Sequence, residues 1–295
     1  MKQFNITEGM SPQIVNLIAR RMGIEDHNHV HPREDFHAVS DTCHIYVVAD
    51  GVTLIQYILD RKPYPHPSPA GDVARIFCEM ALAAAEERYA SFEPNDINEV
   101  FRIGNDAVGA YNTAHGRTKT TVDYWDMDLY AATAALAVIK DGMLYWGSIC
   151  DSYVAQLDNA GSIQFQSPAC SALKQAGAPA FVGDRKNDKE WKRYGWRTKR
   201  NGLNEKGERV GYGVITGEPE ALQYLCSGER PIATDDTVIV FTDGFEHYMQ
   251  SAEFTSLFGA WPDDLENQVK LFSANRVDAE PEKFGLERSL IAARV

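Results

Sequence analysis

The sequence lacks any long apolar run. No segment approaches the roughly 18 or more apolar residues that a membrane-spanning helix requires. Residues 1–13 also lack the apolar core of a secretory signal. We therefore expect a cytoplasmic protein with no membrane partner.

Cysteine is scarce, and its spacing is uninformative. The five cysteines are scattered and form no CxxC pair; they are Cys43, Cys78, Cys150, Cys170 and Cys226. This distribution argues against a disulfide framework and against a zinc site. It predicts reduced, buried thiols of the kind found in the cytoplasm.

Positive charge is in short supply as well. The chain has 29 Lys and Arg against 42 Asp and Glu, a formal net charge of −13. Nucleic acids are bound by cationic surfaces, so we expect no nucleic-acid partner. With 295 residues, 44% of them hydrophobic, the chain can form a substantial core, and no linker divides it. We predict a single domain over residues 1–295.

Two segments of the chain resemble each other. Residues 44–51 and 237–244 are runs of β-branched and aromatic residues, and they end in Asp50-Gly51 and Asp243-Gly244. Runs this apolar are typical of strands buried on both faces. In each case the glycine allows the chain to turn sharply where the strand stops.

An antiparallel meander is predicted between these two segments. Its strands are expected at 134–140, 143–149, 152–157 and 162–166, with a hairpin at Asp141-Gly142 and an interruption at Cys150-Asp151. Helices are expected at 72–89, 96–114, 220–225 and 263–273. The order of elements predicts sheets covered by helices.

One segment differs in character from the rest. Residues 184–200 carry eight Lys and Arg residues interleaved with Trp191, Tyr194 and Trp196, and show little helix or strand periodicity. We interpret residues 175–212 as a basic loop insert. Two roles stay open for it: it faces an anionic substrate, or it is a solvated insert that its tryptophans anchor to the body.

The two strand-end aspartates indicate a metal site. A carboxylate at the end of a buried strand is costly unless its charge is compensated, and two that converge are costlier. Divalent Mg²⁺ or Mn²⁺ resolves both problems, because these cations take oxygen ligands. Gly51 leaves its own carbonyl free to approach such an ion. Other acids occur at Glu34-Asp35, at Asp151 and at Glu287.

This ordered set resembles the metal-dependent protein phosphatases of the protein phosphatase 2C family. The family has an acid pair before the first core strand, a strand ending in Asp-Gly, a Gly-Asp-Ser, a strand ending in Ser/Thr-Asp-Gly and a terminal acid. The matching segments here are Glu34-Asp35, Val47–Gly51, Cys150-Asp151-Ser152, Phe241–Gly244 and Glu287–Ala292, together with Ala132-Thr133. The resemblance implies an α+β fold, a central antiparallel β-sandwich flanked by helices in four layers, α-β-β-α.

The resemblance also implies roles for individual residues. Asp50 would bridge two metal ions and the Gly51 carbonyl would bind one of them. Asp243 and the terminal acid would hold the other ion; Glu287 is the first candidate for that acid and Asp278 the second. Glu34 or Asp35 would act through metal-bound water, and Asp151 would serve a looser third ion. Arg33 is the nearest substitute for the phosphate-binding arginine of the family.

The implied activity is metal-dependent hydrolysis of phosphoserine and phosphothreonine in proteins, with a Ser/Thr kinase as a counterpart. Two departures from the family pattern concern the site: Val52-Thr53-Leu54 stands where a small glycine pair is common, and Cys150 replaces the glycine of Gly-Asp-Ser. Two alternatives stay open. One is a small-molecule phosphohydrolase on the same scaffold, with the basic segment 184–200 as a substrate lid. The other is a catalytically inactive binding or regulatory module, favoured by Glu287 and Cys150, which depart from the family pattern.

The histidines near the N-terminus are a separate case. His27, His29 and His31 alternate beside Glu25 and Asp26. Histidine prefers softer metals than Mg²⁺, so we interpret this segment as a polar loop.

Overall fold

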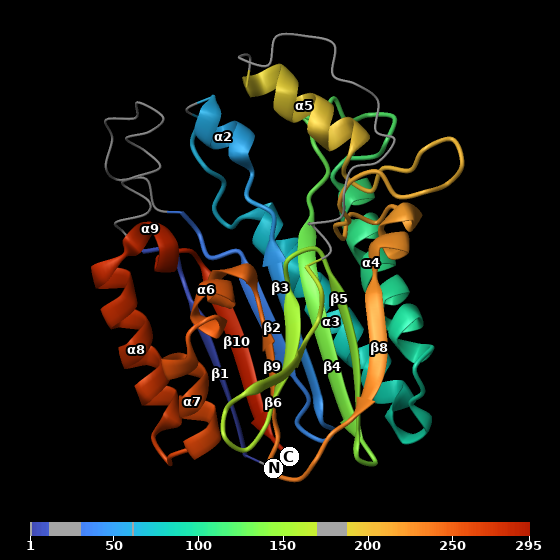
Figure 1. The fold of residues 1–295 in the computed structure, drawn as a ribbon. Helices are drawn as coiled ribbons and strands as arrows, with labels where there is room; N and C mark the ends of the chain where they lie inside the picture. Colours follow the sequence, from blue (N-terminus) through green and yellow to red (C-terminus); the bar gives the residue numbers. More distant parts are fainter. Residues whose placement is uncertain (1, 12–30, 61, 170–187) are drawn as a thin grey trace.

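The computed structural model describes residues 2–11, 31–60, 62–169 and 188–295. Its centre is a pair of antiparallel sheets, each five-stranded within the described residues, with helices against both outer faces (Figure 1). The predicted fold class, a helix-flanked antiparallel sandwich, is confirmed.

The first sheet has the strand order β1-β10-β9-β6-β7. Its strands are β1 (Lys2–Glu8), β10 (Arg288–Arg294), β9 (Thr237–Phe241), β6 (Tyr153–Leu157) and β7 (Ile163–Gln166). The second sheet has the order β2-β3-β4-β5-β8. Its strands are β2 (Asp35–Val39), β3 (Ile45–Gly51), β4 (Ala132–Lys140), β5 (Met143–Ile149) and β8 (Cys226–Pro231).

Different helices cover the two sheets. The second sheet is covered by the long helices α3 (Pro69–Arg88) and α4 (Asp96–Ala114), joined by η1 (Tyr89–Ser91). The first is covered by α6 (Glu246–Met249), α7 (Ala252–Ala260), α8 (Leu265–Ala279) and α9 (Pro281–Phe284). The remaining elements are α2 (Ile55–Leu59), α5 (Asp188–Thr198), η3 (Pro219–Tyr224) and η4 (Asp243–Phe245). The segment 220–225 is thus a 3₁₀ helix.

The strand side chains alternate between three cores. In β3, Ile45 and Val47 pack under α3 and α4, whereas Tyr46 and Val48 point between the sheets. In β9, Ile239 and Phe241 pack under α7 and α8, whereas Val238 and Val240 meet the partner sheet. Because successive strand residues face opposite sides, a strand covered on both faces needs a continuous apolar run. This explains why the apolar runs in residues 44–51 and 237–244 are continuous.

The predicted meander is wrong in one respect. The strands are where the sequence predicts them, but β5 belongs to one sheet and β6 to the other. The chain crosses between sheets at Cys150-Asp151, where Cys150 has a left-handed backbone with φ of 64°. A left-handed residue redirects the chain sharply, so the predicted interruption is a change of sheet. The hairpin at Asp141-Gly142 is confirmed, with both residues at positive φ.

The basic insert is helical where it is described. Residues 188–198 form α5, although the sequence predicts a loop; residues 175–187 lie outside the described residues. The Trp196 ring stacks on Trp125 with centroids 5.8 Å apart. Lys189 Nζ lies 3.8 Å from Asp60 Oδ2, and Arg193 Nη2 lies 3.1 Å from Asp123 Oδ2. Tryptophan packing and ion pairs therefore anchor this segment to the body.

The prediction of reduced cysteines holds only in part. Cys43, Cys78 and Cys150 are free thiols, but Cys226 is disulfide-bonded. Cys170 lies outside the described residues. Among the described residues, none of the helices combines the length and apolar character needed to cross a bilayer.

Candidate functional site

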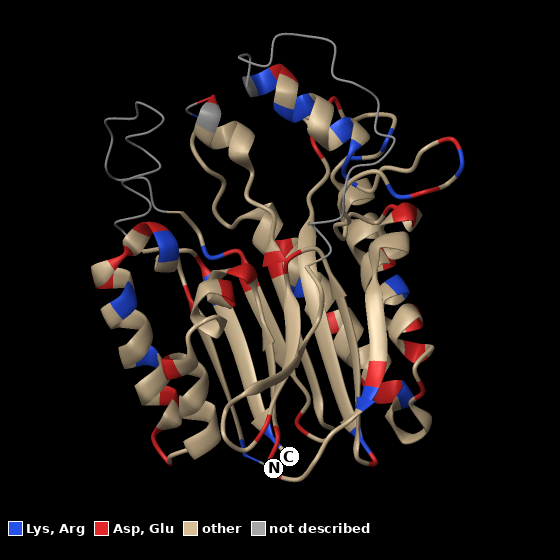
Figure 2. Ribbon diagram, viewed as in Figure 1, with Lys and Arg blue, Asp and Glu red and all other residues tan. Residues whose placement is uncertain are grey.

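Acidic side chains gather at one end of the sandwich. Asp50 is the next-to-last residue of β3 and pairs in register with Asp35, the first residue of the neighbouring strand β2. Asp243 follows β9 in the other sheet and begins η4. Figure 2 shows acidic segments of both sheets at this end, below α2 and α5. Residues almost 200 positions apart in the sequence therefore lie at one sheet end.

The inner layer of this cluster is buried. Glu287 precedes β10, and its Oε1 accepts hydrogen bonds from the backbone N–H of Glu34 at 2.6 Å and of Asp35 at 2.8 Å. The Thr242 hydroxyl donates to Asp35 Oδ2 at 2.7 Å and accepts from Ser289 N–H at 2.8 Å. These bonds join the two sheets and hold Glu287 and Asp35 in fixed orientations.

The outer layer consists of Asp50, Asp151 and Asp243, which keep part of their surface accessible. Burial of the carboxylate, followed by the charges of Asp35, Asp243 and Asp151, raises the pKa of Asp50 well above its usual range. Burial and the charges of Asp151 and Glu246 raise the pKa of Asp243 to about 7. The carboxylates therefore act on one another as a single electrostatic group.

The pKa values of the inner acids are raised as well. Burial and the charge of Glu287 raise the pKa of Asp35 well above its usual range, and Asp35 and Asp50 are close enough to share a proton. Burial raises the pKa of Glu287 to about 7, against the opposing effect of its two backbone hydrogen bonds. Proton sharing is how clustered carboxylates relieve repulsion when no cation is present.

Gly51 and Gly244 both pack closely against the backbone of another segment. A Cβ on Gly51 would lie 2.4 Å from the Ala70 carbonyl oxygen, and one on Gly244 would lie 2.0 Å from the Glu287 carbonyl oxygen. Any side chain would push apart the segments that carry the acids. The glycines are therefore required for close approach as well as for turning the chain.

The Glu34 side chain has hydrogen-bond partners of its own. Its Oε1 accepts hydrogen bonds from Tyr64 OH at 2.7 Å and from Ser68 Oγ. Burial, only partly offset by these two hydroxyls, raises the pKa of Glu34 to about 7. Tyr64 and Ser68 are not among the residues predicted from the sequence. The available signal was Ser68-Pro69, a serine N-cap followed by a first-turn proline, which starts α3 three residues before the predicted helix.

The other predicted site residues are distributed as follows. Glu287 lies in the cluster, whereas Asp278 is exposed on α8. Arg33 lies at the edge of the cluster, where its charge lowers the pKa of Glu287 against the larger effect of burial. His31 Nε2 lies 3.5 Å from Glu34 Oε2. His27 and His29 lie outside the described residues.

The donor set fits a divalent cation. Within residues 2–11, 31–60, 62–169 and 188–295, no three His, Cys, Asp or Glu side chains already surround one point as ligands. The carboxylates are nevertheless crowded enough to raise one another's pKa values, which an added cation would reverse. Hard cations take such oxygen donors. A bound cation would draw these carboxylate oxygens inward.

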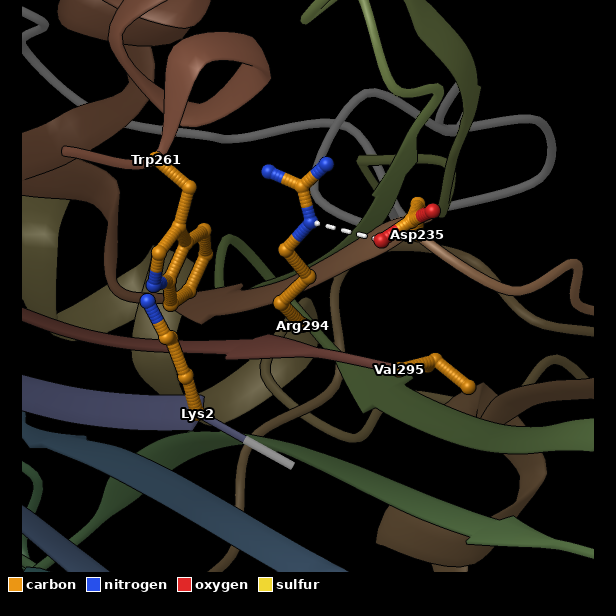
Figure 3. A pocket seen from close by; sticks show the side chains of 5 residues that line it. All are labelled: Lys2, Asp235, Trp261, Arg294 and Val295. Carbon is orange, nitrogen blue, oxygen red and sulfur yellow. Dashed lines mark ion pairs between the residues drawn. The ribbon is translucent and has the colours of Figure 1, made fainter.

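A pocket at the opposite end of the sandwich has a different composition. It has a volume of 430 Å³ and is lined by Lys2, Asp235, Trp261, Arg294 and Val295 (Figure 3). Arg294 Nε pairs with Asp235 Oδ1 at 3.4 Å, and Lys2 Nζ pairs with Asp263 at 3.4 Å. The two cations of this pocket are already paired with carboxylates. The acidic end of the sandwich is therefore the candidate site.

Comparison with known families agrees with this arrangement. The family model described as protein phosphatase 2C matches residues 26–276, which is most of the chain. The chain belongs to the protein phosphatase 2C family. A comparison of this family member with curated proteins finds no match.

Solved phosphatase structures share the fold of this protein phosphatase 2C family member. One is PppA of Pseudomonas aeruginosa, described as a key regulatory component of T6SS, with 12% identity and a TM-score of 0.56 over 100% of this chain and 97% of that one. The photosystem II phosphatase PBCP has 11% identity and a TM-score of 0.55 over 100% and 98%. The catalytic domain of the serine/threonine phosphatase PstP, solved with two manganese ions, has 13% identity and a TM-score of 0.52 over 99% and 96%.

The backbone at Cys150 is left-handed, with φ of 64°, a conformation that glycine adopts without steric cost. The resemblance described above expects a glycine at this position, and the conformation is compatible with that expectation. The Cys150 thiol is buried beside Asp151, and burial, followed by that charge, raises its pKa well above the usual range.

Proposed function

We propose that this protein is a metal-dependent phosphatase that hydrolyses phosphoserine and phosphothreonine in proteins. The observation that carries the proposal is the gathering of Asp35, Asp50, Asp243 and Glu287 at one end of the sandwich, where burial and then mutual repulsion favour a bound cation. Family membership supports the reaction class, and the two manganese ions of the PstP catalytic domain support the metal.

The residues that would hold the ions follow from the layers of the cluster. Asp50, the Gly51 carbonyl and Asp243 would bind two ions of Mn²⁺ or Mg²⁺, with Glu287 completing the set. Asp35 and Glu34 would contribute from the inner layer, and Asp151 would hold a looser third ion. The chemistry supplied by such a pair of ions when bound is activation of water and stabilisation of the charge that develops on the phosphoryl group.

The protein's own residues orient the carboxylates that would hold the ions. The backbone N–H groups of Glu34 and Asp35 fix the Glu287 carboxylate, and the Thr242 hydroxyl fixes Asp35. Asp50, Asp151 and Asp243 form the accessible side, where a phosphate ester would enter. No protein nucleophile is required in this scheme, because water is the attacking group.

The test of the proposal is hydrolysis of an aryl phosphate and of a phosphoserine peptide by purified protein with Mn²⁺. We expect turnover of both, and EDTA should abolish it because the carboxylates cannot activate water without the ions. A panel of small phosphorylated metabolites is the comparison. Faster turnover of a metabolite than of any peptide would favour the small-molecule phosphohydrolase.

A catalytically inactive module is the second candidate. The observation that favours it is that no three ligands converge within the described residues. Absence of turnover with every substrate, in protein that remains folded and binds Mn²⁺, would establish this second role in place of the first.

Arg33 is proposed to bind the substrate phosphate. Within the described residues the structure gives its guanidinium no hydrogen bond or ion pair, and its charge acts on Glu287 at the cluster edge. An arginine fork matches phosphate geometry. Arg33→Gln is expected to raise KM for the aryl phosphate by about tenfold or more, the loss of one charge-assisted contact of about 1.5–3 kcal/mol.

Arg75→Gln is the matched control for Arg33. Arg75 is on the exposed surface of α3 and pairs with Glu79 at 3.0 Å. This variant should keep the KM of the unmodified protein. An unchanged KM in Arg33→Gln would remove Arg33 from the substrate site.

A further inference from the structure

Two hydroxyl groups converge on the buried carboxylate of Glu34. Tyr64 OH donates to Glu34 Oε1 at 2.7 Å, and Ser68 Oγ donates to the same oxygen. The Glu34 side chain is 1% exposed. The second oxygen, Oε2, is buried, makes no hydrogen bond within the described residues and lies 3.5 Å from His31 Nε2. The side-chain hydrogen bonds that hold the carboxylate therefore both go to Oε1.

The two hydroxyl groups are themselves fixed in place. Tyr64 OH accepts from Leu54 N–H at 2.9 Å, and the Tyr64 ring packs against Tyr57 at 6.0 Å. Ser68 is the N-cap of α3, with its Oγ accepting from Ala70 N–H at 3.2 Å. The contact with Glu34 thus links its side chain to two other segments, the turn before α2 and the start of α3.

The backbone of Glu34 joins the two halves of the candidate metal site. Its carbonyl accepts from Gly51 N–H at 3.2 Å, and its N–H donates to Glu287 Oε1 at 2.6 Å. Gly51 follows Asp50, and Glu287 lies in the other sheet. A shift of Glu34 would therefore displace the β3 end and the Glu287 carboxylate together.

We propose that Tyr64 and Ser68 are positioning residues that hold Glu34, and through it Asp50-Gly51 and Glu287, in the geometry that binds the metal ions. This inference rests on the proposed function only in that the cluster must bind Mn²⁺. The groups that orient metal ligands typically contribute 10–100-fold to metal affinity. Loss of either hydroxyl should weaken ion binding and leave the chemistry at saturating metal nearly intact.

The experiment is a calorimetric Mn²⁺ titration of Tyr64→Phe, made without substrate. We expect the dissociation constant for Mn²⁺ to rise about tenfold. Activity assays should show the same rise in the Mn²⁺ concentration for half-maximal rate, with kcat at saturating Mn²⁺ within about threefold of the original. Tyr57→Phe, which removes a hydroxyl from the ring packed on Tyr64, is the matched control and should bind Mn²⁺ normally.

Ser68 is tested by a pair of variants. Ser68→Ala removes both the hydroxyl and the cap of α3, so its effect alone is ambiguous. Ser68→Thr keeps a hydroxyl that can serve both partners. We expect weakened Mn²⁺ binding in Ser68→Ala and recovery to within about twofold in Ser68→Thr.

A double variant shows whether Tyr64 acts through Glu34. If it does, Tyr64→Phe added to Glu34→Gln should weaken Mn²⁺ binding no further than Glu34→Gln alone. Tyr64→Phe with an unchanged Mn²⁺ dissociation constant, or full additivity in the double variant, would overturn the positioning role. Protein that fails to bind Mn²⁺ would overturn it too, whereas protein that binds Mn²⁺ but hydrolyses no phosphate ester would contradict the proposed function alone.

Discussion

Asp243→Asn is expected to lower Mn²⁺-dependent hydrolysis of an aryl phosphate by at least about 100-fold, with little change in the fold. The substitution preserves shape but removes one negative charge from the accessible layer of the cluster. Removing a single group that stabilises transition-state charge commonly costs about 10²–10³ in kcat. The same variant should lose the thermal stabilisation that Mn²⁺ gives, about 4 °C at a hundredfold excess over the dissociation constant.

The control for this prediction is Asp141→Asn. Asp141 is exposed in the β4–β5 hairpin at φ of 51°, a conformation that asparagine also tolerates, and this hairpin is at the opposite end of β4 from the cluster. Its variant should match the original protein in rate and in Mn²⁺ response. Equal activity in Asp243→Asn and Asp141→Asn would remove Asp243 from the site.

Asp128→Asn should produce the largest loss of stability among conservative substitutions of the described acids. Arg200 Nη1 donates to Asp128 Oδ2 at 3.0 Å and Nη2 donates to Oδ1, with side chains 4% and 8% exposed. Burial alone would lower the pKa of Arg200, but the charge of Asp128 raises it above its usual range. The variant leaves a buried guanidinium without its counter-charge, which costs about 3–5 kcal/mol.

Urea denaturation measures this loss as a fall in the free energy of unfolding. Replacing both partners, Asp128→Leu with Arg200→Met, should recover most of it because no unpaired charge remains. Asp106→Asn breaks the exposed pair with Arg102 and should cost no more than about 1 kcal/mol. A comparable loss in Asp128→Asn and Asp106→Asn would show that the buried pair contributes little.

The ion pair between Asp128 and Arg200 is important for the insert, because Arg200 lies two residues after the end of α5. Trp196 of that helix already stacks on Trp125, and Arg200 adds a buried contact to the same region of the body. We expect Asp128→Asn to loosen the insert before the sandwich unfolds. Proteolysis of the folded variant near residues 188–200 would report this directly.

The sequence alone was sufficient for the fold class and for the ends of β3 and β9. Both strands are covered on two faces, so their apolar runs are continuous and their Asp-Gly endings are easy to recognise. Five short motifs in a fixed order then indicated the family, although each is weak separately. Local chemistry determines strand ends, turns and the hairpin at Asp141-Gly142, and these predictions were confirmed.

Tertiary structure decided what depends on contacts between distant segments. The crossing of the chain from one sheet to the other at Cys150-Asp151 has the same local pattern as a broken strand. α5 has helical backbone without a strong sequence signal. The contacts of Glu287 with Glu34 and Asp35 span about 250 positions, and no periodicity reports them.

Some features of the candidate site could also be predicted from the sequence, and others required the folded structure. The sequence by itself determined which carboxylates are available, because the strand-end motifs carry them. Only the folded chain decided that Glu287 and not Asp278 joins the cluster, and that Tyr64 and Ser68 hold Glu34. The physical reason is that a carboxylate's role depends on its burial and on the donors around it, and both are set by packing between elements that are far apart in the chain.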